Sequence, residues 1–229
     1  MSDSPTTTAH GPELLHHFVD AEQQRDAASL GMWLFLITEI MFFGGMFCAY
    51  LVYRYWYFGD FGAASKTLDI RMGAINTAVL ICSSLTVVLA VLAAQNGRRK
   101  MLITNLVLTI VLGLAFLGIK ANEYAEKFEK HHVPGATFHF EGTVPGHPDL
   151  PADQHHAEMF FSLYFAMTGL HALHMIIGIG LFSVLTVMAW KGHYGPVYHT
   201  PIENAGLYWH FVDIVWIYLF PLLYLIDRH

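Results

Sequence analysis

Long apolar stretches alternate with short polar ones along most of this 229-residue chain. Each stretch is long enough to cross a membrane, because a helix needs about 20 apolar residues to span a hydrocarbon core of roughly 30 Å. The pattern predicts an all-α, polytopic membrane protein built as a bundle of five transmembrane helices. We place the spans near residues 27–53, 72–95, 101–120, 158–190 and 205–226.

The segments outside the spans predict a simple domain organisation. Residues 1–26 form a polar N-terminal segment, and residues 27–229 form one transmembrane domain. The longest connection, residues 122–157, contains four prolines, so we expect one long external loop with turns and no extended helix beyond its opening residues. The N-terminus lacks a basic start followed by an apolar core, which argues against a cleaved signal peptide.

Basic residues near the span ends predict the orientation. Arg98, Arg99 and Lys100 lie in the very short connection between the second and third spans. Short loops weigh most in the positive-inside rule, whereas the total count of basic residues on the two sides decides nothing. We therefore predict the N-terminus inside and the C-terminus outside.

Composition narrows the function classes. Hydrophobic residues make up 55% of the chain and charged residues 13%, whereas a soluble domain carries roughly a quarter charged residues. The net charge of −6 and the scattered basic residues exclude a nucleic-acid partner. Cys48 and Cys82 both fall in apolar runs, so we expect packing residues and no disulfide.

Five ionisable residues lie near the middle of the spans, where each costs about 2.5 to 3.5 kcal/mol to insert. They are Glu39, His171, His174, His210 and Asp213. Flanking charges place Glu39 and His174 at one depth, so we expect these two side chains to meet across the first and fourth spans. For Glu39, a structural bond between helices and a proton-linked role both remain open.

His210 and Asp213 are three residues apart on one predicted helix, so they share a face. We expect them to satisfy each other or a neighbouring helix. Further polar and small residues in the spans predict helix packing. The predicted interhelical hydrogen-bonding residues are Asn76, Thr77, Ser83, Ser84 and Asn105, and the predicted sites of close backbone approach are Gly44, Gly45, Gly169, Gly178 and Gly180.

A metal centre is the competing interpretation of the histidines in and between the spans. His171 and His174 could face one metal ion or haem, but such a site needs further ligands and supporting hydrogen bonds that the pattern does not supply. The pairs His16-His17, His131-His132 and His155-His156 lie outside the spans, where we expect solvent contact. We predict no metal ligand, no cofactor-binding residue and no catalytic residue, because the chain shows no nucleophile with a base and no phosphate-binding glycine loop.

Four motifs, in one order, resemble the subunit III family of haem-copper respiratory oxidases, typified by cytochrome c oxidase subunit III. They are LFLITEIMFFGGMF (residues 34–47), IKANEY (119–124), MTGLHALHMIIGIG (167–180) and YWHFVDIVW (208–216). In this resemblance Glu39 matches the family's carbodiimide-reactive carboxylate. His171, His174, His210 and Asp213 occupy matching signature positions.

The resemblance implies a non-redox helper that carries no metal and packs against catalytic subunit I of a proton-pumping oxidase. The haems and copper belong to partner subunits, and the helper binds phospholipid and sustains proton uptake. The implied partners are subunits I and II, with subunit IV or a larger respiratory supercomplex as further candidates. A quinol oxidase subunit, an accessory protein of nitric oxide reductases and a stand-alone histidine-ligated metal enzyme remain as alternatives.

The chain departs from longer family members, which have seven helices. The two N-terminal helices are absent here, and the polar segment 1–26 stands in their place. Five-helix forms are a bacterial pattern, which implies the bacterial cytoplasmic membrane. The missing pair forms one arm of the lipid cleft in longer members, so that side is left for a neighbouring subunit to close.

Overall fold

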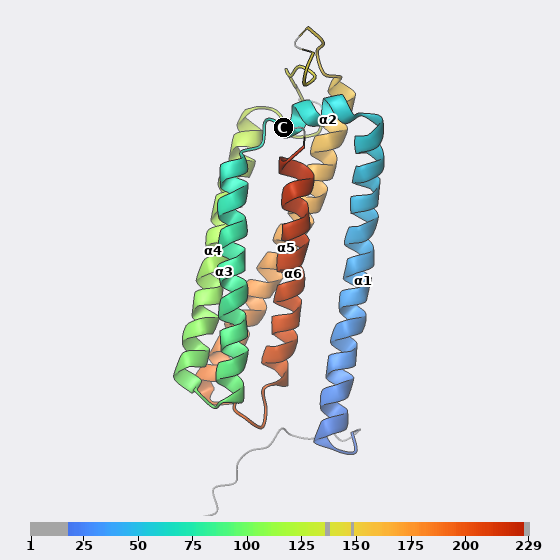
Figure 1. The fold of residues 1–229 in the computed structure, drawn as a ribbon. Helices are drawn as coiled ribbons and strands as arrows, with labels where there is room; N and C mark the ends of the chain where they lie inside the picture. The colour runs from blue at the N-terminus through green and yellow to red at the C-terminus, as the bar shows by residue number, and fades with distance from the viewer. Residues whose placement is uncertain (1–17, 136–137, 148, 227–229) are drawn as a thin grey trace, which may run out of the picture.

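The computed structural model describes residues 18–135, 138–147 and 149–226, and within them the chain is helical with no strand (Figure 1). The predicted all-α, polytopic fold is confirmed, because five of the helices are long and apolar enough to cross a membrane. The helices are α1 (Ala21–Trp56), α2 (Phe58–Ser65), α3 (Ile70–Gln95), α4 (Arg99–Glu129), α5 (Gln154–Lys191) and α6 (Thr200–Tyr224).

The helices extend beyond several of the predicted spans. α1 begins at Ala21, before the predicted residue 27, because the carboxylate of Asp20 caps it by accepting a hydrogen bond from the amide of Gln23 at 2.7 Å. α4 continues past residue 120 to Glu129. Hydropathy locates the lipid-embedded part of a helix, whereas capping residues decide where the helix itself begins.

The short helix α2 was not predicted. It follows α1 directly and lies across one end of the bundle, between α1 and the start of α3 (Figure 1). Phe61 of α2 is fully buried against Tyr50 and Phe160, with ring centroids 5.7 and 5.4 Å away. Eight residues cover little more than two helical turns, too few for a helical period to stand out in the sequence.

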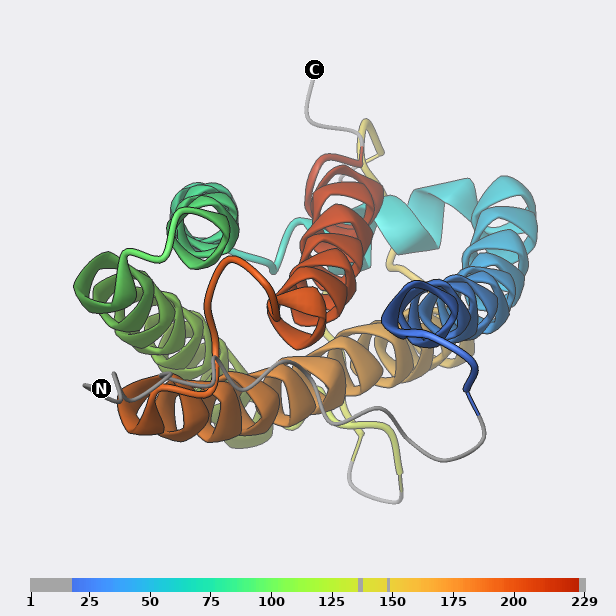
Figure 2. The same ribbon diagram turned by 90° about the horizontal axis from the view of Figure 1, so that it is seen from below.

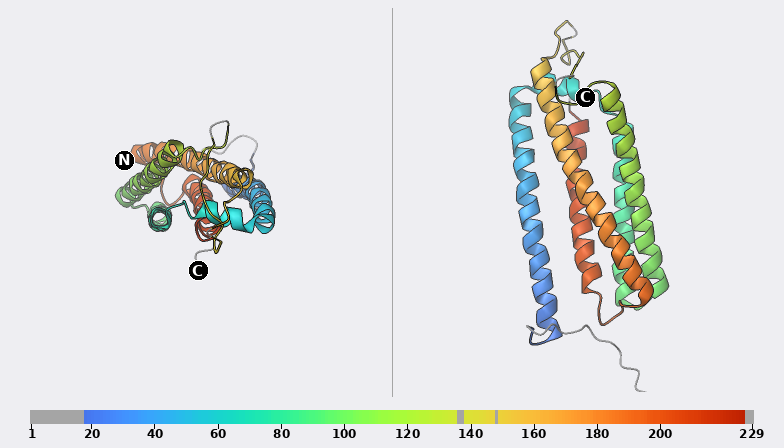
Figure 3. Two further views of the ribbon diagram at one scale, coloured as in Figure 1. Left: turned by 90° about the horizontal axis from the view of Figure 1, so that it is seen from above. Right: turned by 180° about the vertical axis from the view of Figure 1, so that it is seen from behind.

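Helices α3 to α6 pack together, and α1 stands at their side (Figure 2). α5 crosses the bundle obliquely, from beside α1 at the α2 end to beside α4 at the opposite end (Figure 3). Only 17% of the most apolar window of α1 is buried, compared with 56% for α6. α1 is therefore the least supported span in the described part of the chain.

The predicted close approaches are partly wrong. A Cβ at Gly178 would lie 2.6 Å from the Trp209 ring, so α5 and α6 do need a glycine there. At Gly44, Gly45 and Gly180 a Cβ would meet nothing within 4 Å among the described residues. Gly45 and Gly180 are exposed, and Gly44 lines an open groove between α1 and α6. Hydropathy does not tell which side of an apolar helix packs against a neighbour.

Candidate functional site: a polar pair between α1 and α5

Glu39 of α1 and His174 of α5 form the contact predicted from their depth. Nε2 of His174 lies 3.2 Å from Oε2 of Glu39, and the side chains are 11% and 21% exposed. Each residue lies within two positions of the middle of its helix. The predicted pairing across these two spans is confirmed.

Neighbouring groups fix the orientation of the His174 ring. Its Nδ1 is 2.9 Å from the carbonyl of Leu170, which can only accept, so Nδ1 carries a proton and donates it. The Phe43 ring packs edge-on against the imidazole, with centroids 5.5 Å apart. Tyr208 of α6 donates to the backbone carbonyl of His174 at 2.9 Å, which ties the same turn of α5 to α6.

This geometry leaves one position for a proton between the two side chains. With Nδ1 protonated, Nε2 either accepts from a protonated Glu39 or donates to its carboxylate. A polar contact is possible in both cases, so the pair can hold a proton or release it while the two side chains stay together. A polar pair of this kind can link helices and can also exchange a proton.

His171 does not join this pair. Its ring lies in the core between Phe116 and Trp216, with centroids 5.4 and 5.3 Å away, and neither ring nitrogen has a hydrogen-bond partner among the described residues. Within the same residues no group of three histidine, cysteine, aspartate or glutamate side chains is arranged to hold a metal ion. His171 and His174 therefore point to different surroundings despite their spacing.

His210 and Asp213 do not bond to each other. Nδ1 of His210 lies 2.7 Å from the hydroxyl of Ser84 on α3, so the prediction of a neighbouring helix holds for His210. Asp213 is 4% exposed, yet neither carboxylate oxygen has a hydrogen-bond partner in the described part of the chain. For Asp213 the predicted partner is therefore missing within these residues.

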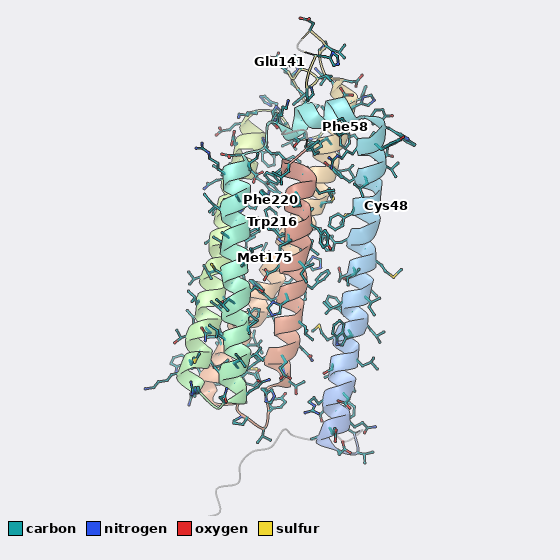
Figure 4. The ribbon with its side chains drawn as sticks, in the orientation of Figure 1. Cys48, Phe58, Glu141, Met175, Trp216 and Phe220 are labelled. Atoms are coloured by element: carbon teal, nitrogen blue, oxygen red, sulfur yellow. The ribbon has the colours of Figure 1, made fainter. Side chains whose placement is uncertain are left out.

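The predicted interhelical hydrogen bonds are present at other positions of α3. Trp209 donates to Ser83 at 3.0 Å, and Trp216 donates to Thr77 at 3.1 Å. Asn76 is buried with no partner for either amide atom among the described residues, so the prediction fails there. Figure 4 shows Trp216 and Phe220 on α6 beside α3, with Cys48 apart on α1.

A second polar cluster, which the sequence pattern did not predict, lies between α4, α5 and α6. Lys120 and Glu123 of α4 are 3.1 Å apart and almost fully buried. Tyr164 of α5 and Tyr224 of α6 each donate to Glu123, at 2.7 and 2.6 Å, and both hydroxyls also accept from Lys120. The three-residue spacing of Lys120 and Glu123 was the available signal, but residue 120 ends the predicted span 101–120, so no buried pair was expected there.

The loop histidines are only partly solvent-exposed. His132 stacks on Phe161, and burial lowers the pKa of its imidazole to about 4. His156 stacks on Tyr57 at 3.6 Å and contacts Asp60 at 2.7 Å, whereas His131 and His155 are exposed. The expected solvent contact therefore holds for one member of each pair, and His16-His17 lies outside the described residues.

Comparison with known proteins supplies the family context. A family model described as cytochrome c oxidase subunit III matches residues 17–146 and 155–227. Cytochrome c oxidase subunit 3 of Gallus gallus is 34% identical over 200 residues, which cover 85% of this chain and 67% of the relative.

Bacterial relatives match over almost their full length. The cytochrome bo(3) ubiquinol oxidase subunit 3 of Pseudomonas aeruginosa is 30% identical over 218 residues, or 95% of this chain and 93% of the relative. Cytochrome c oxidase subunit 3 of Thermostichus vulcanus is 31% identical over 212 residues, or 91% and 92% of the two chains. These relatives are named for two different electron donors.

Proposed function

Because this chain belongs to the cytochrome c oxidase subunit III family and is an accessory subunit of a haem-copper oxidase, we propose that it keeps protons supplied to the catalytic subunit during O2 reduction. Family membership implies a complex with other oxidase subunits. The proposed partners are subunit I, which holds the haems and copper of the active centre, and subunit II. In this proposal the chain itself performs no redox step.

The Glu39–His174 contact is the observation that carries the proton-linked role. A carboxyl group and an imidazole lie 3.2 Å apart near the middle of two spans, and Glu39 lies on α1, the span with the least packing support in the described part of the chain. Ionisable side chains at this depth are functional candidates because an unpaired charge there is costly. The contact can exist with Glu39 either protonated or ionised. A contact that served only to hold the helices together would not need this property.

Glu39→Gln in the intact oxidase tests this assignment. Glutamine can still hydrogen bond to His174 but cannot exchange a proton, so we expect wild-type haem content and a wild-type initial rate of O2 consumption. Thr38→Val is the matched control, because the Thr38 hydroxyl bonds within its own helix to the carbonyl of Phe35. Loss of haem from the Glu39→Gln enzyme would contradict a role in a helper subunit.

A bound phospholipid is part of the proposal. A groove of about 490 Å³ between α1 and α6 is lined by apolar side chains, among them Leu36, Phe43 and Ile214. A second pocket of about 530 Å³ lies where the two helices begin, and Arg25 and Asn204 line it. An acyl chain fits the first space, and Arg25 supplies a donor for a phosphate in the second.

The lipid proposal is tested by native mass spectrometry of the purified complex. Arg25→Gln is expected to reduce the phospholipid retained per subunit III, since it removes the only arginine lining the described pocket. Arg98→Gln is the control, because Arg98 lies in the connection between α3 and α4 and does not line this pocket. Equal lipid retention in both variants would refute the headgroup site.

The proposed location is the bacterial cytoplasmic membrane, with the N-terminus in the cytoplasm and the C-terminus in the periplasm. The basic connection between α3 and α4 supports this orientation. Arg99, at the start of α4, also holds this connection against α5 by donating to the carbonyls of Ala189 and Trp190 near the end of α5. A membrane-impermeant thiol reagent is expected to label a cysteine placed at Gly97 only after the cells are opened. Labelling in intact cells would reverse the orientation.

The electron donor is cytochrome c in the leading proposal and quinol in the alternative. The Pseudomonas aeruginosa relative, named as a subunit of a ubiquinol oxidase, supports the alternative. The copper content of the co-purified subunit II separates them, because a copper centre in that subunit indicates cytochrome c. Absence of copper together with quinol-driven O2 consumption would favour the quinol oxidase.

A further inference from the structure

A small pocket with a polar centre opens along the seam between α3 and α6. Its volume is about 320 Å³, and it is lined by Leu80, Ile81, Ser84, His210, Asp213, Ile214 and Ile217. Ile81, Ile214 and Ile217 are each about half exposed. The seam is therefore an apolar outer face with three polar side chains at its centre.

The three polar side chains cannot satisfy all of their hydrogen-bonding capacity by bonding to one another. The Ser84 hydroxyl has one proton and lies 2.7 Å from Nδ1 of His210, whereas the carboxylate of Asp213, which lines the same pocket, has no hydrogen-bond partner among the described residues. If Ser84 donates to His210, Asp213 receives nothing from it. If Ser84 donates to Asp213, one bond still leaves most of the acceptor capacity of that carboxylate unused.

The unsatisfied group is deep in the protein and in the membrane. Asp213 is 96% buried, lines the pocket, and has no hydrogen bond to either oxygen among the residues that the structure describes. It lies near the middle of α6, where burial of a polar group without a hydrogen bond is costly. Glu39 lies at a similar depth but has His174 as its partner.

Lipid is a poor cover for this seam. Acyl chains carry no hydrogen-bond donor, so they would leave Asp213 unsatisfied, and water is scarce at mid-depth on a lipid-facing surface. The α1–α6 groove on the other flank of α6 differs, because its described lining residues include no carboxylate and His210 and Tyr218 are their only ionisable side chains. The α1–α6 groove therefore suits an acyl chain, whereas the α3–α6 seam needs a neighbour that carries a hydrogen-bond donor.

We propose that the α3–α6 seam docks a transmembrane helix of a partner oxidase subunit, which places an N–H or O–H donor beside Ser84, His210 and Asp213. The inference rests on the proposed function, because it requires that the chain work in an oxidase complex. The apolar residues beside the pocket supply the packing surface. The polar centre fixes the depth and rotation of the docked helix, as hydrogen bonds between transmembrane helices do.

Site-specific photocrosslinking in membranes tests the docking surface. Benzoylphenylalanine at position 217 is expected to form adducts with another polypeptide of the oxidase. The same group at position 111 is the control, because Val111 is an exposed apolar residue on α4, away from the seam. Lipid adducts alone at position 217, or equal polypeptide adducts at both positions, would overturn the inference.

Purification of the tagged chain separates this inference from the proposed function. If haem-containing subunits do not accompany the chain after mild detergent extraction, the proposed function fails. If they accompany it but position 217 labels only lipid, the proposed function stands and the docking surface fails. If they accompany it and position 217 labels one of them, both are supported.

Substitutions in the polar centre test the hydrogen bond itself. Asp213→Leu is expected to speed the loss of this chain from the detergent-solubilised complex by about three- to thirtyfold, the range of one hydrogen bond between membrane helices. Asp213→Asn retains an acceptor and should recover most of the loss. Wild-type retention of Asp213→Leu, or equal loss in Asp213→Asn, would contradict the proposed donor.

Ser84→Ala and Ser183→Ala form a second matched pair. Both serines are half-buried in spans, but the Ser183 hydroxyl donates within its own helix, to the carbonyl of Ile179. We expect faster dissociation only for Ser84→Ala. Equal dissociation rates in the two variants would remove Ser84 from the docking site.

Discussion

The Lys120–Glu123 cluster and the Glu39–His174 pair both hold ionisable side chains among apolar helices, but they are built differently. Glu123 receives hydrogen bonds from three groups on three helices, and its side chain is 2% exposed. Within the part of the chain that the structure describes, Glu39 pairs with His174 on one neighbouring helix, and its side chain is 21% exposed. The first arrangement links α4, α5 and α6 through hydrogen bonds. The second links α1 to α5 through a single contact, so the carboxyl group can exchange a proton and α1 is held less firmly.

The aromatic surroundings strengthen this difference. The Lys120 ammonium lies within 5.5 Å of the ring centres of Tyr124, Tyr164, Trp216 and Tyr224. Cation–π contacts of this kind stabilise a desolvated charge. His174 instead meets the edge of Phe43, a contact that fixes the ring without adding charge stabilisation to the pair.

The largest expected effect comes from breaking the closed cluster. Glu123→Leu strands the Lys120 charge in the core and should cost roughly 3 to 5 kcal/mol of stability, measured as a lower midpoint of thermal unfolding of the complex. The double variant Lys120→Met, Glu123→Leu should recover much of that loss because no uncompensated charge remains. Additive losses in the double variant would show that the two charges are not coupled.

A smaller effect is expected at the open pair. Glu39→Ala leaves Nε2 of His174 without its partner, so α1 should loosen by roughly 1 to 3 kcal/mol. Hydrogen exchange of the purified complex should show faster exchange in α1, with α4 as the internal reference. Unchanged exchange in α1 would mean that packing alone holds this helix.

Glycine substitutions compare packing in the two regions without touching charge. Gly178→Ala would bring a Cβ to 2.6 Å from the Trp209 ring, and the overpacking should cost about 1 to 3 kcal/mol. Gly180→Ala on the same helix and Gly44→Ala on α1 meet nothing within 4 Å among the described residues and should stay within about 0.5 kcal/mol. Thermal unfolding of the three variants measures this. Equal losses would contradict the tight α5–α6 contact.

The smallest effect is expected outside the membrane, at His132. Burial lowers the pKa of this imidazole from 6.5 to about 4, with Lys127 and Lys130 adding to the shift. The folded state therefore prefers the neutral ring, and its stabilising contribution, full above about pH 6.5, should be lost as the pH falls toward 4. Proteolysis of the loop should accelerate over this range.

A histidine pair provides the control for that pH dependence. His132→Phe should remove the dependence, because phenylalanine can still stack on Phe161 and does not titrate. His155→Phe changes an exposed histidine and should leave the dependence as in the wild type. The same acid-induced cleavage in all three proteins would assign it to another group.

Depth alone was enough to predict the Glu39–His174 pair, because two polar residues at one level in neighbouring spans have few other partners. It was not enough for Asp213, whose position in the span says nothing about which face meets a neighbour. The Lys120–Glu123 cluster was missed because two of its members, Tyr164 and Tyr224, look like ordinary apolar aromatics in a hydropathy pattern. Such clusters depend on three-helix geometry that sequence spacing within one helix does not specify.

The packing of α1 could not be predicted from the sequence either. Its hydropathy resembles that of the other spans, yet its apolar surface is mostly uncovered by the described residues. Periodicity indicates which positions are apolar, but lipid and protein neighbours are both apolar in a membrane. Only the fold shows that a Cβ at Gly45 would meet no other side chain among the described residues.

The proton-linked role of Glu39 is tested most directly by following O2 consumption of the Glu39→Gln oxidase in proteoliposomes over many turnovers. We predict a wild-type initial rate followed by early loss of activity, with Thr38→Val indistinguishable from wild type throughout. Glutamine can keep a polar contact with His174, so the substitution removes proton exchange and leaves the contact possible. Activity that lasts as long as in the wild type would contradict the role and leave the pair as a structural contact.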